Sequence, residues 1–339
     1  MTDAPLLQVT GLTKHYTGHR RLGQRIAGVP QTVVRAVSDV SLSVRHGEIL
    51  GLIGESGCGK STLGRAILRL HEPTSGKVIF DGTDVTALDA DRLKAMRRRM
   101  QIIFQDPYAS LNPRRTVAEI VGLPLRLHGL AKTEDELRAK VAAMVEKVGL
   151  KSNQLDRYPH QFSGGQRQRI GIARALISNP EFIVCDEPVS ALDVSIQAQI
   201  IELLQELKAE LGLTYLFISH DISVIGYLSD RVAVMYLGEI VEMGPVDAVL
   251  SRPRHPYTQS LMSAVPEVDA VGHKTRVRLS GDLPSPLNPP AGCKFHTRCP
   301  LATDICRSKA PVAETVGDGH VSACHRLAEN LSLLEGATA

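Results

Sequence analysis

The residues Gly54-Glu55-Ser56-Gly57-Cys58-Gly59-Lys60-Ser61-Thr62 directly follow the apolar run Ile49-Leu50-Gly51-Leu52-Ile53. Together the two stretches predict a buried strand, a glycine-rich loop and the start of a helix. In this layout, backbone N–H groups at a helix N-terminus surround a polyphosphate. The alternative is a glycine-rich turn before an ordinary helix, which the complete spacing and the Lys-Ser-Thr ending disfavour.

Each residue type in this phosphate loop, residues 54–62, suits one task. Gly54, Gly57 and Gly59 permit backbone angles and a close phosphate approach that a Cβ would block. Lys60 can reach the β- and γ-phosphates, and the Ser61 hydroxyl can ligate Mg²⁺. We therefore expect every residue of the loop to contribute to nucleotide binding.

The composition is that of a globular chain without an extended nucleic-acid surface. The 339 residues are 43% hydrophobic and 22% charged, which suggests two or three packed units. The net charge is only +3, from 39 basic and 36 acidic residues, and no long basic stripe is present. The triplet Arg97-Arg98-Arg99 is interpreted as a solvated helix end.

Signals of export and membrane insertion are absent from the sequence. The opening Met-Thr-Asp-Ala-Pro has neither a charged n-region nor an apolar h-region. No uninterrupted apolar segment approaches the roughly 18–20 residues that a membrane span needs. We expect a cytosolic chain whose contact with a membrane runs through a partner.

The residues before the phosphate loop predict a small antiparallel sheet with strands at 6–10, 33–37 and 40–44. The basic, glycine-containing segment 19–31 is expected to be an exposed insertion. Tyr16 lies just before it and can stack on a nucleotide base, although a lone aromatic is more often a packing residue. Its place upstream of a phosphate loop favours the stacking role.

Gln105 follows the short apolar strand 102–104, and Pro107 then forces the chain out of regular structure. Its amide can reach a metal ion and the attacking water, or it can simply cap the strand. From residue 107 to residue 179 the pattern becomes helical, with a helix predicted at 134–148. We expect this helical unit to be inserted into the nucleotide-binding core.

A second anion site of a different type is predicted near the end of the helical unit. Ser163, Gly164 and Gly165 stand at a helix start and are followed by Gln166. This site lacks the lysine of the phosphate loop. Two unlike phosphate sites in one chain indicate that the second serves the nucleotide of a partner subunit, with ATP between the two.

Carboxylates follow a predicted buried parallel strand at 181–187. Asp186 would hold Mg²⁺ through water, and Glu187 would polarise the water that attacks the γ-phosphate. A salt-bridged strand end is the alternative. The strand 213–219 ends in His220, which can touch the γ-phosphate, although a lone histidine is usually structural.

In this order, the motifs resemble those of the ATP-binding subunits of ABC transporters. They correspond to Walker A at 54–62, the Q-loop at Gln105, the signature at 162–166, Walker B at 182–187, the D-loop at 190–193 and the switch histidine at His220. Phe162 stands where the family usually has leucine, which keeps the position apolar. Segments 105–113, 158–160, 188–199 and 255–258 look like the oligopeptide/dipeptide importer subfamily, and most like the second of its two ATPase subunits. The resemblance covers nearly the entire chain.

The resemblance implies an α/β fold. The chain would consist of a P-loop NTPase (ABC ATPase) core with an antiparallel β subdomain and an inserted helical subdomain. A small Cys-rich C-terminal domain would follow the core. The core would comprise residues 1–105 and 180–255, the helical signature subdomain 106–179, and the Pro- and Cys-rich regulatory or metal domain 256–339.

The resemblance also implies an ATPase that powers peptide import from the cytoplasmic face of the cell membrane. Glu187, His220 and Gln105 would act in hydrolysis, and Ser61, Gln105 and Asp186 would hold Mg²⁺. The implied partners are a homologous second ATPase subunit, two transmembrane permease subunits and an extracytoplasmic solute-binding protein, with no nucleic acid. Two ATPase subunits would close head to tail around two ATP molecules and drive the permeases.

Four of the six cysteines lie in the proline-rich tail, at Cys293, Cys299, Cys306 and Cys324. Clustered thiols in a cytosolic chain indicate a metal before disulfides, and the gaps are wider than those of zinc knuckles. They suit a [4Fe–4S] cluster, which some members of the importer subfamily carry in a tail that this one resembles. Zinc, with help from nearby histidines, and free thiols are the alternatives.

A second function class remains open, namely a soluble ABC ATPase that acts on nucleic acid or ribosomes. The single set of motifs and the nearly neutral charge disfavour it. Within the importer subfamily, the sequence leaves open whether the substrate is a dipeptide, an oligopeptide, nickel, glutathione or an opine. It also leaves open whether the ATPase pairs with itself or with a homologue.

Overall fold

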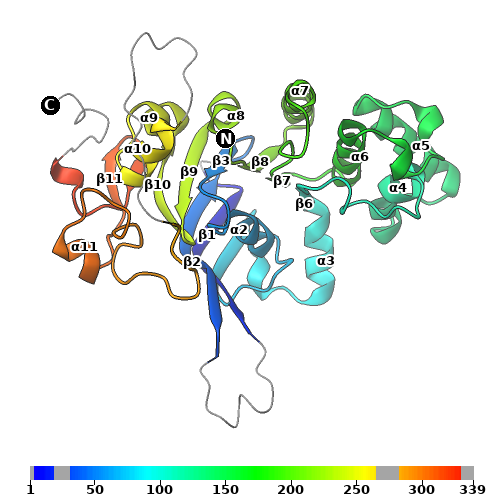
Figure 1. Ribbon diagram of the computed structural model, residues 1–339. Coiled ribbons are helices and arrows are strands. Elements are labelled where there is room, and N and C mark those ends of the chain that lie inside the picture. The colour runs from blue at the N-terminus through cyan, green and yellow to red at the C-terminus, as the bar shows by residue number, and fades with distance from the viewer. Residues whose placement is uncertain (1–3, 19–30, 265–281, 330–339) are drawn as a thin grey trace. The chain divides into compact units, whose positions relative to one another are not determined.

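A computed structural model describes residues 4–18, 31–264 and 282–329 (Figure 1). The chain divides into two compact units. Unit 1 comprises Met1–Leu6, Val44–Ile49 and Asp81–Ser219, and unit 2 comprises Leu7–Ser43, Leu50–Phe80 and His220–Ala339. The phosphate loop and the tail cysteines belong to unit 2. All but one residue of the predicted insertion 19–31 lies outside the described residues, and the four-part division stays a prediction.

Parallel strands lie at the centre of unit 1 in the order β8-β7-β6. Their bounds are Met100–Ile103 for β6, Phe182–Asp186 for β7 and Thr214–Ile218 for β8. Every residue of β7 and β8 is buried, which explains why both strands appear in the sequence as continuous apolar runs. The register sets Ile103 opposite Cys185 and Asp186 opposite Ile218, so the carboxyl ends of the strands meet at one edge.

The helical part of unit 1 contains α4, α5 and α6, at Val117–Leu127, Glu134–Lys147 and Gly164–Leu176 (Figure 1). Helix α4 begins at a capping box in which Thr116 and Glu119 satisfy each other's backbone N–H groups. Thr133 caps α5 in a similar way by accepting from the backbone of Glu136. The helix predicted at 134–148 is therefore confirmed, within a residue at its end.

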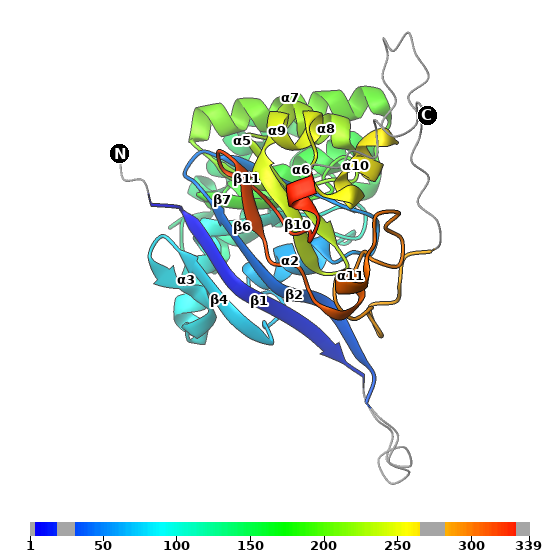
Figure 2. The ribbon, with the colours of Figure 1, turned by 90° about the vertical axis from the view of Figure 1, so that its left-hand side faces the viewer.

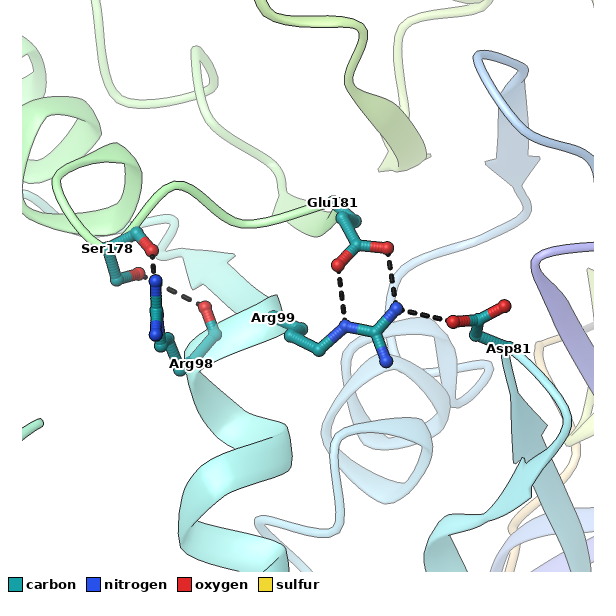
Figure 3. A network of polar contacts seen from close by, with 5 residues as sticks. All are labelled: Asp81, Arg98, Arg99, Ser178 and Glu181. Atoms are coloured by element: carbon teal, nitrogen blue, oxygen red, sulfur yellow. Dashed lines mark hydrogen bonds and ion pairs between the residues drawn. The ribbon is translucent and has the colours of Figure 1, made fainter.

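The arginine triplet ends α3, Ala90–Arg99, as the sequence predicts, with Arg97 and Arg98 exposed, but Arg99 is half-buried and ion-paired. Arg99 forms two bonds to Glu181, at 2.5 and 2.7 Å, and a third of 2.6 Å to Asp81 (Figure 3). Arg98 donates from Nε to the carbonyl of Ser178 at 3.4 Å, and the Ser178 hydroxyl donates back to the carbonyl of Arg98 at 3.2 Å. These bonds attach α3 and the start of β6 to the residue that precedes β7.

Unit 2 contains an antiparallel sheet in which β1 lies between β2 and β4 (Figure 2). The strands span Leu7–Thr17, Val33–Val44 and Ser75–Phe80. The prediction of separate strands at 33–37 and 40–44 is wrong, because both segments belong to β2. Asp39 takes a left-handed φ of 52° and so breaks the sequence alternation without ending the strand.

Within unit 2, a second set of paired strands runs in the order β11 (Glu314–Gly317), β12 (His320–Ser322), β10 (Glu239–Pro245), β9 and β3. Strand β3, Ile49–Ile53, is parallel to β9, Arg231–Tyr236, and the following pairs are antiparallel. Strands β11 and β12 come from the tail, and Glu242 of β10 lies opposite Ser322 of β12. Within unit 2, residues of the Cys-rich tail therefore share a sheet with the strand that leads into the phosphate loop.

The remaining elements are helices, short 3-10 turns and one two-residue strand. They are α2 (Lys60–Ile67), α7 (Val194–Leu211), α8 (Ile222–Leu228), α9 (Val246–Ser251), α10 (Pro256–Ser263), α11 (Asp304–Ser308), β5 (Thr83–Asp84), and the 3-10 turns η1 (Val85–Ala87), η2 (Ser152–Gln154), η3 (Pro159–Gln161) and η4 (Leu327–Glu329). Among the described residues, no helix combines the length and the apolar character needed to cross a membrane.

Candidate nucleotide site

Two of the three phosphate-loop glycines are required by neighbouring backbone. A Cβ on Gly54 would lie 2.2 Å from the carbonyl oxygen of Met235, and one on Gly59 would lie 2.1 Å from that of Ala36. Both also have positive φ, at 153° and 111°. A Cβ on Gly57 would meet nothing within 4 Å. Backbone packing thus explains Gly54 and Gly59, while room for a phosphate remains the predicted reason for Gly57.

Lys60 opens helix α2 and folds back over the loop. Its side chain is buried, and Nζ donates to the carbonyl oxygens of Gly54 at 2.7 Å and Glu55 at 3.1 Å. The N-cap residue Gly59 has no side chain with which to cap the helix. A lysine above a helix start of this kind suits a polyanion, because the helix dipole and the ammonium both favour negative charge.

The neighbouring Cys58 is buried, as expected of a small apolar filler. Burial raises the pKa of its thiol, although the ammonium of Lys60 acts in the opposite direction. Cys185 in β7 is fully buried as well.

Tyr257 and Arg298 also contact the loop, and the sequence analysis missed both. The backbone N–H of Glu55 donates to the Tyr257 hydroxyl at 2.8 Å, and Arg298 pairs with the Glu55 carboxylate at 2.9 Å. Burial opposes the charge of Arg298, but its bond to Glu55 raises the pKa above the usual arginine value. Because 202 residues separate Glu55 from Tyr257, only the segment 255–258 offered a signal, and it indicated family resemblance rather than contact.

Tyr16 and His220 also belong to unit 2. The half-buried ring of Tyr16 packs edge-on against His71 with centroids 5.8 Å apart, and Lys14 Nζ lies 4.8 Å from its centroid. These contacts suit a packing residue and leave base stacking a prediction. His220 is exposed and comes directly before Asp221, which caps helix α8.

Unit 1 brings Gln105 and Glu187 together. Nε2 of Gln105 donates to a carboxylate oxygen of Glu187 at 2.8 Å. Glu187 has a left-handed φ of 47°, held by its backbone N–H bond of 3.1 Å to the carbonyl of Ile218. Strain at a carboxylate that follows a buried strand is typical of functional positions. Asp186, directly before it, has no solvent exposure at all.

The second predicted anion site, at the start of α6, is closed by its own side chains. The hydroxyl of Ser163 accepts from the backbone of Gln166 at 3.3 Å, and the Gln166 amide oxygen accepts from the backbone of Ser163 at 3.1 Å. A Cβ on Gly165 would lie 2.5 Å from Cγ2 of Ile196 in α7, and one on Gly164 would lie 3.4 Å from Cδ2 of Leu192. Phe162 is buried, as the apolar replacement of leucine predicts.

Helix α6 is also attached to the segment that carries Gln105. Arg174 donates to the carbonyl of Ser110 at 2.6 Å, and Gln168 donates to that of Phe104 at 3.5 Å. The guanidinium of Arg167 lies 4.0 Å from the ring centroid of Tyr108, which is 63% exposed. Within unit 1, residues 104–110 are therefore bonded to α6, the helix that follows the signature, so a movement of one would displace the other.

The four tail cysteines line one small cavity, together with His296 and His325. All six cysteines of the chain are free thiols. Burial raises the pKa of Cys293 to about 11 and of Cys299 to about 12, and nearby thiols of the set add to both shifts. Among the described residues, no group of three or more histidine, cysteine or acidic side chains is arranged to hold a metal ion. The arrangement thus gives the zinc alternative and the cluster no direct support.

Comparison with known proteins agrees with this geometry. The family model described as "ABC transporter" matches residues 37–190, and that of the oligopeptide/dipeptide transporter C-terminal region matches residues 241–306. Among solved structures, the dimeric ATP-binding cassette MJ0796, in a post-hydrolysis state with ADP and Pi, aligns with a TM-score of 0.62 and 32% identity. The alignment covers 71% of this chain and 98% of that one.

Curated relatives match over almost the full length. A putative peptide import ATP-binding protein of Brucella ovis is 50% identical over 327 residues, covering 96% of this chain and 99% of that protein. The oligopeptide transport ATP-binding protein AppF of Bacillus subtilis is 50% identical over 323 residues, covering 94% and 97%. With such identity across both matched regions, the chain belongs to the ATP-binding proteins of ABC transporters, in the oligopeptide/dipeptide transporter group.

Proposed function

We propose that the chain is the ATP-binding and ATP-hydrolysing subunit that powers peptide import through an ABC transporter. Its partners would be two transmembrane permeases, a homologous second ATPase subunit and an extracytoplasmic solute-binding protein, and it would sit at the cytoplasmic face of the membrane. The observation that carries the proposal is the bond between Gln105 and Glu187, in a chain half identical to peptide import ATP-binding proteins.

In this proposal, Glu187 polarises the water that attacks the γ-phosphate, and Gln105 orients the same water. The bond between them holds the carboxylate at the end of β7 until substrate arrives. Lys60 would exchange its carbonyl partners for phosphate oxygens, and His220 would contact the γ-phosphate. Ser61, Gln105 and Asp186 offer the oxygen ligands that Mg²⁺ prefers, and the ion would neutralise charge on the β- and γ-phosphates.

We assign the loop 163–166 to the nucleotide of the partner ATPase. Its capping box would have to share the Ser163 hydroxyl with a phosphate that lies at the start of α6. The segment from Gln105 to Asn112 would receive the permeases. The bonds from α6 to residues 104–110 support this assignment, because they would pass permease movement to the signature.

The hydrolysis step is tested by Glu187→Gln in the complex assembled with its permeases and partner ATPase. ATP binding should be retained and turnover should fall by about 100-fold or more, as loss of a general base predicts. Glu202→Gln, at an exposed position of α7, is the matched control and should hydrolyse ATP normally. Undiminished turnover in Glu187→Gln would contradict the assigned role.

The substrate class is tested by uptake in cells that lack the gene. Restoring the wild-type chain should restore uptake of labelled dipeptides or oligopeptides, and Glu187→Gln should not. If nickel, glutathione or an opine is taken up instead, the ATPase assignment stands and the peptide assignment falls. Co-purification of permeases and a second ATPase in mild detergent checks the proposed partners.

We further propose that Cys293, Cys299, Cys306 and Cys324 hold a [4Fe–4S] cluster. The support is the type of donor alone: the four cysteines line one cavity in an irregular segment, and such clusters are bound by four thiolates, although the described thiols are not arranged around a metal position. The cavity is only about 10 Å³, so the thiol side chains would have to turn outward to admit a cluster. When bound, a cluster would cross-link the tail, which is too small to be held by apolar burial alone.

The cluster proposal has a readout independent of ATPase activity. Protein purified without oxygen should be brown, with broad absorption near roughly 400 nm, as thiolate-bound iron gives. Cys306→Ser should be colourless, whereas Cys185→Ala, which alters a thiol outside the tail, should keep the colour. Colourless wild-type protein with stoichiometric zinc would favour the zinc alternative.

A further inference from the structure

Glu55 is the junction between the phosphate loop and the tail. Its backbone N–H donates to the Tyr257 hydroxyl at 2.8 Å, and its carboxylate pairs with Arg298 at 2.9 Å. Its carbonyl oxygen accepts from Nζ of Lys60 at 3.1 Å. One residue of the loop thus connects the phosphate-binding lysine to two side chains of the C-terminal region.

The two contacting side chains are held rigidly. Tyr257 is fully buried, and its ring packs against those of Tyr236 and Phe295, with centroids 4.7 and 5.4 Å away. The Arg298 side chain is 9% exposed, and its backbone N–H donates to the carbonyl of Phe295 at 2.9 Å. The Tyr257 hydroxyl cannot leave Glu55 without disturbing this aromatic cluster, Tyr236, Tyr257 and Phe295, and the backbone that carries Arg298 is bonded to the cluster at Phe295.

A second connection reaches the other side of the loop. Lys294 donates from Nζ to the carbonyl of Leu237 at 3.1 Å, and the next residue, Gly238, donates its backbone N–H to the carbonyl of Cys58 at 2.8 Å. The tail segment 293–299 therefore contacts Glu55 directly and Cys58 through a single turn. Its ends are Cys293 and Cys299, two of the four thiols that line the tail cavity.

We propose that Arg298 and Tyr257 are positioning residues of the ATP site, through which the tail sets the affinity of the phosphate loop for ATP. This inference rests on the proposed ATPase function and adds a region outside the nucleotide motifs to it. Arg298 neutralises a carboxylate beside the place where a polyphosphate binds. Without it, Glu55 would repel the phosphates and compete with them for Lys60.

Tyr257 acts on the same residue through the backbone. The backbone N–H of Glu55 donates to the Tyr257 hydroxyl, and this bond fixes the orientation of the Glu55 peptide in the phosphate loop. Loss of the hydroxyl leaves this partly buried N–H without its partner and frees the peptide to rotate. We expect a smaller effect than from Arg298, because no charge is exposed.

The test is equilibrium binding of a fluorescent ATP analogue to the full-length chain. Arg298→Ala should weaken binding roughly tenfold, within the range usual for coupled sites, and Tyr257→Phe should weaken it less. Glu55→Gln, a change within the phosphate loop itself, is measured as the reference background. The double variant Arg298→Ala/Glu55→Gln should bind as tightly as Glu55→Gln does, because no unpaired carboxylate remains for Arg298 to neutralise. Arg307→Ala, an exposed arginine of the same tail, is the matched control.

The double variant separates positioning from folding. If Arg298 served only to fold the tail, the defect would persist unchanged in the Glu55→Gln background, and that result would overturn the inference. Wild-type affinity in Arg298→Ala would also overturn it. In the assembled complex, Arg298→Ala should raise KM for ATP and leave kcat within about twofold, since the residue does not touch the reacting atoms.

Failure of the inference can be told from failure of the proposed function. If the wild-type chain itself does not bind the analogue, the ATPase assignment falls and the inference falls with it. If the wild type binds and Arg298→Ala binds equally well, the ATPase assignment stands and the tail has no part in nucleotide affinity.

Discussion

The two predicted phosphate sites of this chain are built in opposite ways. In unit 2, the phosphate loop depends on distant residues, because Gly54 and Gly59 pack against the backbone of Met235 and Ala36. In unit 1, the start of α6 is closed by a capping box between Ser163 and a glutamine three residues later. The first site is held by tertiary contacts and the second largely by local ones.

The two sites are therefore vulnerable to different substitutions. A locally capped helix start should survive changes elsewhere in its unit, and it can open by rotating one hydroxyl. A loop fixed by distant backbone should lose its shape when any support is removed. It also provides a path for control, since the tail contacts it at Glu55.

The largest effect expected is from Gly59→Ala in the phosphate loop. The new Cβ would lie 2.1 Å from a backbone oxygen at a φ of 111°, so unfolding free energy should fall by about 3 kcal/mol or more. Denaturant unfolding measures it. Gly57→Ala has positive φ but no neighbour within 4 Å and should cost clearly less. Equal losses would show that backbone conformation, rather than packing on β2, shapes the loop.

Acid should destabilise the region that supports the phosphate loop, because His255 is bonded to Tyr257 and Tyr257 is bonded to Glu55. The capping box at the start of α6 contains no group that titrates in the same pH range. Nδ1 of His255 accepts from the backbone of Tyr257 at 3.1 Å, and burial lowers the pKa of His255 to about 4, against the opposing pull of Glu242. Between its ordinary pKa near 6.5 and this value, the unfolded chain binds a proton that the folded chain does not. The free energy of unfolding should therefore fall, by up to about 3 kcal/mol, as pH drops through this window.

The pH dependence is measured by denaturant unfolding at pH 7 and pH 5. His255→Asn keeps an acceptor at the helix cap without a titrating group, so its stability should change less between the two pH values. An unchanged slope in this variant would assign the acid sensitivity to other residues.

In unit 1, Gly165→Ala tests the tighter of the two glycine contacts of the capped helix start with the residues around α7. A Cβ there would lie 2.5 Å from Cγ2 of Ile196, and we expect a loss of about 2 kcal/mol. Adding Ile196→Ala removes that atom, so the double variant should be more stable than Gly165→Ala alone. Gly171→Ala, in the same helix with nothing within 4 Å, should be neutral or slightly stabilising.

The smallest effect expected is from Ser163→Ala, which removes only the local cap. Stability should fall by about 1 kcal/mol, the usual cost of losing a capping hydroxyl. Ser163→Thr keeps the acceptor and should stay near wild type. A loss as large as that of Gly59→Ala would mean that the start of α6 depends on more than its capping box.

Local patterns predicted the parts of the site that lie within a few residues of each other. The apolar run of β7 placed Asp186 and Glu187 at the end of a buried strand, and the spacing from Gly54 to Lys60 placed a lysine at a helix start. The same approach split β2 in two, because Asp39 breaks the alternation by a change in φ that no residue pattern reports. The sequence placed the arginine triplet at a helix end but did not show the ion pairs of Arg99, since its partners Asp81 and Glu181 lie far from it in the sequence.

Most strands, the loop chemistry and the order of the motifs could be read from the sequence, because residue periodicity and helix capping are short-range effects. The contacts of Gln105 with Glu187, and of Arg298 and Tyr257 with Glu55, could be found only in the folded structure. Such meetings depend on how strands are ordered in a sheet and how side chains pack. These pairs are 82 to 243 positions apart in the sequence, so no local residue pattern predicts that they are in contact.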